Sequence, residues 1–229
     1  MKIALNEALL PTYQLIIDTL GKDNVYLVGG VVRDTLLKKE THDLDFACLL
    51  SPEEIHAAFK DSLYFAKYGT VSFKDGKNHV TIAAFRKESD YKDYRHPGKV
   101  TFVKSLEEDF KRRDFTINCL YVDGNFDVID PTNRGIEDLT NHTICIIGNP
   151  EQRLLEDPLR ILRACRFKYE LGFKYEEETR KALLKQEHLI SLLKKQKIME
   201  EIHKCPKIYQ EKMIEELHLE QYCGIIEPR

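Results

Sequence analysis

The sequence predicts an α+β fold in which a mixed β-sheet is followed by a helical region, and three observations carry this prediction. An apolar strand, a short helix and a second strand follow one another within residues 25–45. Two further strands, at residues 64–73 and 78–85, flank an Asp-Gly pair, which is a strong hairpin signal. From Pro150 onward, apolar residues recur at helical spacing. Antiparallel strands added to a strand–helix–strand unit favour an α+β sheet with a crossover helix over a doubly wound Rossmann sheet.

The first half of the chain begins with an amphipathic helix, because apolar residues recur at three- and four-residue steps up to Gly21, where we expect the helix to end. The members of this stripe are Leu5, Leu9, Tyr13, Ile16 and Leu20. Residues 25–28 form an apolar run typical of a buried strand, and residues 31–37 can be helical. Ser51, followed by proline and two glutamates, indicates a helix start, and this helix should run to about residue 60.

The second half of the sheet region contains both loops and strands. Residues 87–97 are polar, charged and carry two tyrosines, so we expect a mobile loop. Residues 105–110 are acidic and should be helical. A strand at residues 117–122 and another at residues 126–129 flank an Asp-Gly-Asn turn. The helical spacing that follows places a domain boundary near residue 149, which divides the chain into residues 1–149 and 150–229.

Composition excludes several classes of protein. The chain has 229 residues, enough for one larger domain or two small ones, and its net charge of -3 excludes a uniformly basic nucleic-acid surface. The six cysteines are well separated, which excludes Cys-x-x-Cys sites and favours reduced thiols in the cytoplasm. No signal peptide or membrane-length apolar stretch is present, and the scattered histidines make a histidine metal site unexpected. No membrane association and no stable protein partner are expected.

The first candidate site combines Gly29 and Gly30 with Asp43 and Asp45. Carboxylates two residues apart on a strand point the same way and can share a divalent cation. Glycines between a strand and a helix let a phosphate approach the backbone, where free N–H groups favour anions. The alternative is ordinary, because a Gly-Gly pair is often only a tight turn and an Asp-x-Asp pair only a solvated strand end. No Gly-Lys-Ser/Thr follows the glycines, so this is not a P-loop.

A second cluster is formed by Arg112, Arg113, Asp114 and Asn118. The two arginines supply forked donors suited to phosphate, and the aspartate and asparagine can hydrogen-bond a sugar hydroxyl. In isolation, a solvated charged helix end is an equally good interpretation.

A third cluster lies in residues 156–163, which include Glu156, Asp157, Arg160 and Arg163. If a helix starts here, Asp157 and Arg160 face the same side and can present a joined acceptor and donor edge. Asp followed by Pro is also an N-cap signal, so Asp157 could simply cap the helix while Arg160 bonds a neighbouring carboxylate. The residues alone leave both interpretations open.

Taken together, these motifs resemble the nucleotidyltransferases that include class II CCA-adding enzymes and bacterial poly(A) polymerases. Residues 27–37 with Asp43 and Asp45 resemble motif A, and RRDFTINC at residues 112–119 resembles motif B, with Cys119 in place of alanine. Residues 130–139 resemble motif C, residues 156–160 motif D, and residues 197–204, more weakly, motif E. Residues 87–97 resemble the flexible loop of enzymes that add the terminal adenosine. The likeness covers about residues 4–205 and implies a nucleotidyltransferase head followed by a helical neck.

The resemblance implies template-independent addition of C and A to the tRNA 3′ end from CTP and ATP, with release of pyrophosphate. It implies that two Mg²⁺ ions are held by the catalytic aspartates, and it assigns the other candidate residues by motif. The catalytic and metal-binding residues are Asp43 and Asp45; the triphosphate-binding residues are Gly29, Gly30, Arg33 and Arg113; the ribose-binding residues are Asp114, Asn118 and Arg112; the base-selecting residues are Asp157, Arg160 and Glu156, with Arg163 as a further nucleotide contact.

One departure from the family pattern concerns the metal site. Relatives usually carry a third acid five positions before the Arg of a Phe-Arg pair, and counting back from Arg86 gives Thr81, a weak neutral ligand. The alternatives are an enzyme that adds only the terminal A, a poly(A) polymerase and, less favoured, a non-catalytic RNA- or nucleotide-binding module.

Overall fold

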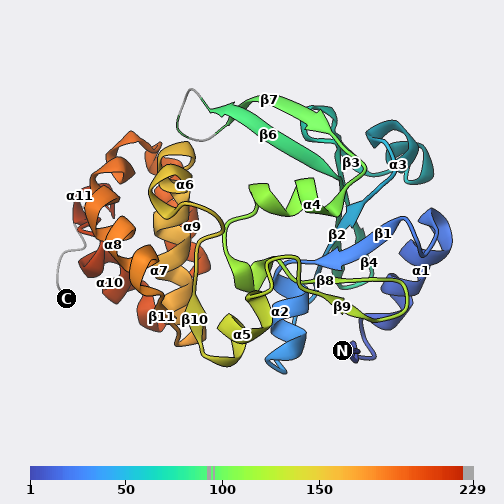
Figure 1. The fold of residues 1–229 in the computed structure, drawn as a ribbon, viewed down its shortest axis with the longest axis horizontal. Helices are drawn as coiled ribbons and strands as arrows, with labels where there is room; N and C mark the ends of the chain where they lie inside the picture. Colours follow the sequence, from blue (N-terminus) through green and yellow to red (C-terminus); the bar gives the residue numbers. More distant parts are fainter. Residues whose placement is uncertain (92–93, 95, 224–229) are drawn as a thin grey trace. The chain divides into compact units, whose positions relative to one another are not determined.

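The chain forms two compact units in the computed structural model, which describes residues 1–91, 94 and 96–223 (Figure 1). The first unit comprises Met1–Ser89 and Lys99–Glu137, and the second comprises Asp90–Gly98 and Asp138–Arg229. The chain thus enters the second unit at Asp90–Gly98 and again after Glu137, whereas the sequence indicated one boundary near residue 149.

A seven-stranded mixed sheet organises the first unit, in the order β3-β4-β5-β2-β1-β8-β9. The strands are β1 (Val25–Val28), β2 (Asp43–Cys48), β3 (Leu63–Phe65), β4 (Thr70–Asp75), β5 (Asn78–Ala84), β8 (Tyr121–Val122) and β9 (Val128–Ile129). β2 and β5 run parallel, and the other neighbours are antiparallel. The predicted α+β class with a mixed sheet is confirmed. The chain between the parallel strands passes through α3 (Pro52–Ala58), whereas α2 (Gly30–Leu36) joins the antiparallel neighbours β1 and β2.

The two faces of the sheet differ sharply in polarity. Because side chains alternate along a strand, Leu44 and Phe46 of β2 share a face, and both are buried. In-register neighbours continue this face as core, since Val80 and Ile82 of β5 are also buried. Asp43 and Asp45 belong to the opposite face, where both are exposed. The buried face therefore fixes which way the two carboxylates point.

The helices of the first unit follow the predicted signals. They are α1 (Leu10–Leu20), α2, α3, α4 (Leu106–Asp109) and α5 (Gly135–Thr140). All five residues of the predicted apolar stripe are buried, although Leu5 and Leu9 precede α1, which begins next to Pro11. Gly21 ends the helix with a positive φ of 85°, and α3 begins with a capping box between Ser51 and Glu54.

Three sequence predictions about strands were wrong. Residues 64–73 are two antiparallel strands, because a 3-10 turn at Ala66–Tyr68 and Gly69 in the left-handed conformation reverse the chain. Most of residues 117–122 is not strand, since Thr116–Asn118 forms a 3-10 turn and only Tyr121–Val122 pairs.

The third correction concerns residues 87–97. They were expected to be a loop, but β6 (Arg86–Tyr91) and β7 (Pro97–Phe102) form a separate two-stranded sheet. Residues 92, 93 and 95, which belong to the predicted loop, lie outside the described residues.

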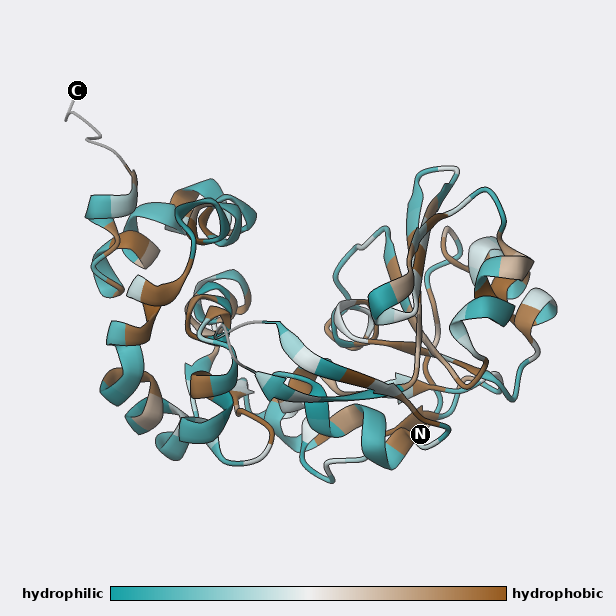
Figure 2. Cartoon of the chain, turned by 90° about the horizontal axis from the view of Figure 1, so that it is seen from above, coloured by the Kyte–Doolittle hydropathy of each residue, from teal (hydrophilic) through white to brown (hydrophobic). Residues whose placement is uncertain are grey.

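The second unit is mainly helical, as the spacing after Pro150 predicts. Its helices are α6 (Pro150–Glu156), α7 (Leu159–Leu171), α8 (Glu177–Gln186), α9 (Lys195–Lys204), α10 (Lys207–Glu216) and α11 (Glu220–Cys223), with a small parallel pair of strands, β10 (Thr143–Ile144) and β11 (Lys174–Tyr175). Both hydrophobic and hydrophilic residues occur along these helices (Figure 2). Helix α7 packs against α9 and α10. Among the described residues, no helix is both long enough and apolar enough to cross a membrane.

Candidate active site

The turn between β1 and α2 brings backbone close to a carboxylate. Gly29 has a φ of 85°, a backbone conformation that residues other than glycine rarely adopt. A Cβ atom at this position would lie 3.6 Å from Asp45 Oδ2. The turn therefore lies next to Asp45, near the start of β2, and a shared phosphate and metal site for the paired glycine and aspartate motifs stays a prediction.

Asp43 and Asp45 present two hard oxygen ligands on the exposed face of β2. This donor set fits a divalent cation such as Mg²⁺ that keeps waters and substrate oxygens as its remaining ligands. Among the described residues, no group of three or more His, Cys, Asp or Glu side chains could hold a metal by itself. Thr81 is the Cα partner of Asp45 on the parallel strand β5, so it stands where a third carboxylate would face the same ion.

Arg33 is a buried residue of α2 with partners on two sides. Its side chain is only 5% exposed and pairs with Asp34, with Nε donating to Oδ1 at 2.8 Å and Nη2 to Oδ2 at 2.9 Å. Its Nη1 donates to Asn118 Oδ1 at 2.7 Å. Arg33 thus links α2 to the second predicted cluster, and its direct contact with a triphosphate stays a prediction.

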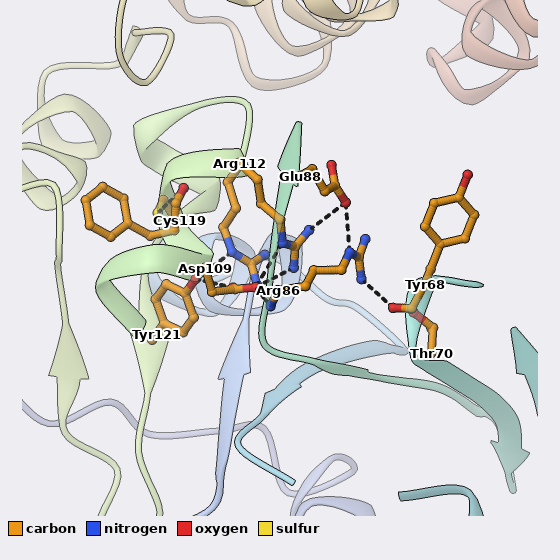
Figure 3. A network of polar contacts seen from close by, with 10 residues as sticks. Tyr68, Thr70, Arg86, Glu88, Asp109, Arg112, Cys119 and Tyr121 are labelled. Atoms are coloured by element: carbon orange, nitrogen blue, oxygen red, sulfur yellow. Dashed lines mark hydrogen bonds and ion pairs between the residues drawn. The ribbon is translucent and has the colours of Figure 1, made fainter. Parts of the chain in front are cut away.

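The second cluster is built on a buried acid that the sequence analysis missed. Asp109, at the end of α4, is fully buried, and its Oδ1 lies 2.8 Å from Arg112 Nη2 and its Oδ2 3.1 Å from Arg113 Nη2. The Tyr121 hydroxyl donates to Asp109 Oδ2 at 2.8 Å (Figure 3). The same hydroxyl accepts from Arg113 Nε at 2.7 Å. The sequence signal was available, because the acid precedes the two arginines by three and four residues, the spacing of helical ion pairs.

Electrostatics keep this network charged. Burial alone would raise the pKa of Asp109, but the positive charges of Arg113 and Arg112 and the Tyr121 hydrogen bond lower it to about 2. Burial raises the pKa of Tyr121, so its hydroxyl keeps the proton that it donates. Both arginines are therefore held by a carboxylate that stays ionised throughout the physiological range.

The network continues to the start of β6. The Arg86 backbone N–H donates to Asp109 Oδ1 at 3.2 Å, and its Nε donates to Glu88 Oε1 at 2.7 Å (Figure 3). Arg112 Nη1 lies 3.9 Å from the same Glu88 oxygen. The side chain of Arg112 thus lies between two acids from different elements.

Asp114 and Asn118 lie together, as the ribose-binding assignment requires. Asp114 Oδ1 accepts from the Phe115 backbone N–H at 2.8 Å and from Asn118 Nδ2 at 3.4 Å. Cys119, which replaces the alanine of the motif, is buried, and burial raises the pKa of its thiol to about 12.

The third cluster lies at the junction of α6 and α7 in the second unit. Asp157 has an extended backbone, and its Oδ1 accepts from Leu159 N at 3.1 Å, which is a helix-capping bond. Arg160 is buried and donates from Nη1 to the Arg153 carbonyl at 2.5 Å, with Glu156 Oε2 3.8 Å away. The structure therefore brings Glu156, Asp157 and Arg160 together and also shows the capping contact that the alternative interpretation predicts.

The further contact predicted for Arg163 lies one turn along α7. Its guanidinium carbon is 5.6 Å from the centre of the Phe167 ring. This distance is typical of a cation–π contact.

A pocket of about 620 Å³ lies one strand away from Asp43. His79 of β5 is the Cα partner of both Asp43 and Lys74, and both His79 and Lys74 line the pocket. Lys60 and Ser62 contribute further polar side chains from the turn after α3. The lining therefore combines two lysines with one acid, Asp61, and His79 is in register with Asp43.

Comparison with known proteins places the chain in a family. The family described as the poly A polymerase head domain matches residues 25–145. A CCA-adding enzyme of Lactobacillus helveticus is 44% identical over 180 residues, which are 78% of this chain and 45% of that protein. A crystal structure of the Bacillus stearothermophilus CCA-adding enzyme in complex with CTP matches 95% of this chain and 54% of its own, with a TM-score of 0.80 and 32% identity.

A second solved structure, of a tRNA nucleotidyltransferase complexed with a primer tRNA and an incoming ATP analog, matches 89% of this chain and 59% of its own. Its TM-score is 0.71 at 30% identity. The chain spans about half the length of the curated relatives that it matches. Because the head-domain match covers more than half of the chain and includes the Gly29 turn, both aspartates and the Arg112 cluster, the chain belongs to the family of the poly A polymerase head domain.

Proposed function

We propose that this chain is the catalytic part of a template-independent RNA nucleotidyltransferase that adds C and A to the 3′ end of tRNA from CTP and ATP. One observation carries the proposal: Asp43 and Asp45 project from the exposed face of β2 next to the Gly29 turn. The names of the similar proteins support it, because the relative in Lactobacillus helveticus is a CCA-adding enzyme and one similar structure contains CTP.

In the proposed reaction, the oxygen of the RNA 3′-hydroxyl forms a bond to the α-phosphorus of the nucleotide. The bond from that phosphorus to the bridging oxygen breaks, pyrophosphate leaves with its electron pair, and the hydroxyl proton passes to solvent. Asp43 and Asp45 would hold Mg²⁺, which when bound supplies charge neutralisation and lowers the pKa of the attacking hydroxyl.

The other residues act by binding and orientation. The Gly29 and Gly30 backbone admits the triphosphate, and Arg113 adds positive charge near it. Asp114 and Asn118 would bind the ribose, with Arg112 as support. In the second unit, Asp157 and Arg160 would read the base, because a carboxylate accepts from the amino group of cytosine or adenine while a guanidinium donates to the neighbouring ring nitrogen. Glu156 would take part in base selection with them, and Arg163 would make a further contact with the nucleotide.

The acceptor RNA would approach along the pocket beside Asp43. Lys60 and Lys74 line this pocket and are suited to a phosphate backbone in a chain whose net charge is -3. All six cysteines have free thiols, which supports a reducing, cytoplasmic setting for the reaction.

The test is incorporation of labelled nucleotides into tRNA that lacks CCA, CA or only A, with Mg²⁺ present and the products sized. The proposal expects two C and then one A. Addition of A alone would indicate a terminal A-adding enzyme, and long A tracts a poly(A) polymerase. Nucleotide binding without release of pyrophosphate would indicate a non-catalytic module.

Two variants make the assay specific. Asp43→Ala should abolish incorporation without changing the melting temperature, because the side chain is exposed. Asp18→Ala, an exposed aspartate on α1, should leave both unchanged. Turnover retained in Asp43→Ala would refute the metal assignment.

A further inference from the structure

Arg33 lies between the Asp34 carboxylate and the Asn118 side-chain amide. It is buried on α2, and its Nε and Nη2 donate to the two oxygens of the Asp34 carboxylate in a bidentate ion pair. This pair leaves Nη1 aimed at Asn118 Oδ1, 2.7 Å away, across a sequence separation of 85 residues. A planar guanidinium that is hydrogen-bonded to a carboxylate along one edge has little rotational freedom, so the direction of its Nη1–H is fixed.

That direction determines how the Asn118 amide is oriented. Arginine has only donors, so the asparagine oxygen must face it, since a flipped amide would oppose two donors. The amide nitrogen then faces Asp114, whose Oδ1 it approaches at 3.4 Å. Asn118 is only 7% exposed, so water has little access to compensate a flipped amide.

We propose that Arg33, clamped by Asp34, is a positioning residue that sets the Asn118 amide for selection of ribonucleotides over deoxyribonucleotides. A ribose 2′-hydroxyl both donates and accepts, and it is matched by a carboxylate that accepts and an amide nitrogen that donates. With the amide reversed, the hydroxyl would meet two acceptors. This inference rests on the proposed function, in which Asp114 and Asn118 bind the ribose, and it assigns Arg33 a role other than direct triphosphate binding.

The two roles of Arg33 predict different kinetics. A triphosphate contact is made equally to CTP and dCTP, so its loss lowers kcat/KM for both by the same factor. A positioning role acts only through the 2′-hydroxyl, so its loss lowers kcat/KM for CTP more than for dCTP. The ratio of the two values is therefore the readout, and a general weakening of the fold does not change it.

The experiment measures kcat/KM for CTP and dCTP with tRNA lacking CCA, in the wild type, Arg33→Lys, Asn118→Asp and the double variant. Lysine keeps the positive charge but lacks the planar set of donors that pairs with Asp34 and Asn118. We expect the ratio of kcat/KM for CTP to kcat/KM for dCTP to fall about tenfold in each single variant, because a tenfold change corresponds to the free energy of about one hydrogen bond. This ratio should fall no further in the double variant, because both changes remove the same hydrogen bond between Arg33 and Asn118.

Arg166→Lys is the matched control, since Arg166 is also a buried arginine in ion pairs, with Glu170 and Glu201, but belongs to α7 of the second unit and contacts neither Asp114 nor Asn118 in these pairs. Its ratio should equal that of the wild type. If Arg33→Lys does not fold, Asp34→Asn provides a second test, because it weakens the ion pair that orients Arg33 and its side chain is partly exposed. It should lower the ratio of kcat/KM for CTP and dCTP by the same factor. Equal losses for CTP and dCTP, or additive losses in the double variant, would overturn the inference.

Failure of the proposed function is distinguishable from failure of this inference. A wild type without turnover would argue against the enzyme, and calorimetric binding of CTP and dCTP would then test the positioning role directly. The same tenfold loss of preference in Arg33→Lys would support it, and unchanged preference would refute it.

Discussion

Replacing Asp157 by Asn should destroy nucleotide selection while leaving α7 intact. The Asp157 Oδ1 atom accepts from Leu159 N at 3.1 Å, and an asparagine oxygen can make the same capping bond. The substitution replaces the second carboxylate oxygen by an amide N–H₂ group, which donates instead of accepting. The two proposed roles of one side chain are thereby separated.

The expected magnitudes follow from these contacts. Loss of the cap in Asp157→Ala should lower the free energy of unfolding by about 1 kcal/mol, whereas asparagine, an equally good cap, should cost only a few tenths. A hydrogen bond from the base to a charged acceptor is worth about 1.5–3 kcal/mol, so kcat/KM for CTP and ATP should fall about ten- to hundredfold in both variants. In Asp157→Asn the new donor should also favour the carbonyl oxygens of GTP and UTP.

The assay pairs urea denaturation with incorporation of each of the four nucleotides. The wild type and Asp157→Asn should have nearly equal unfolding midpoints and different nucleotide preferences. If Asp157→Asn keeps the wild-type preference for CTP and ATP over GTP and UTP, the base-reading role is refuted and Asp157 is only a helix cap. If Asp157→Ala is as stable as the wild type, the capping bond contributes nothing measurable.

Three further changes test the first unit. Thr81→Asp should lower the Mg²⁺ concentration needed for half-maximal activity, because it adds a carboxylate beside Asp45; an unchanged metal titration would contradict the shared site. Asp109→Asn should lower the free energy of unfolding at pH 7 by about 3 kcal/mol in urea denaturation, since two arginines lose a buried counter-charge. The folded pKa of Asp109, about 2, is below its ordinary value, so the wild type loses this stabilisation as pH falls from about 4 through about 2, and the variant should lack that part of the acid slope. Lys74→Glu should raise the KM for tRNA with little effect on the KM for CTP, and equal KM values for tRNA would exclude this pocket as the acceptor path.

Local signals predicted those elements whose formation depends on their own residues. The helix before Gly21, the capped helix after Ser51 and the hairpin at Asp75 each carry their start or stop signal in the sequence, and all three are present. The exposed face of β2 was also predictable, because alternation of Asp43, Leu44 and Asp45 sets the two carboxylates opposite a buried leucine.

The errors fall where tertiary contacts decide the backbone. Gly69 reverses the chain where a Cβ atom would lie 2.4 Å from Phe102, a neighbour distant in sequence. The turn at Asn118 is joined to Arg33 from another element, and no local pattern contains that bond. β6 and β7 form a separate two-stranded sheet in which few residues are buried, so the apolar alternation used to recognise strands was absent.

Register explains why Thr81 has a consequence beyond one missing ligand. In the parallel pair, Asp45 and Thr81 are Cα partners, and Ser72 follows Thr81 on β4, so one row across the sheet carries a carboxylate and two hydroxyls. Adjacent strands are about 4.8 Å apart, close enough for side chains in one row to share an ion or a bridging water. Two carboxylates bring one negative charge fewer than three, so bare cation affinity falls while repulsion of an incoming triphosphate falls with it. A cation at this site would therefore be held jointly by protein and nucleotide, and its binding should depend more strongly on the nucleotide than in a three-acid site.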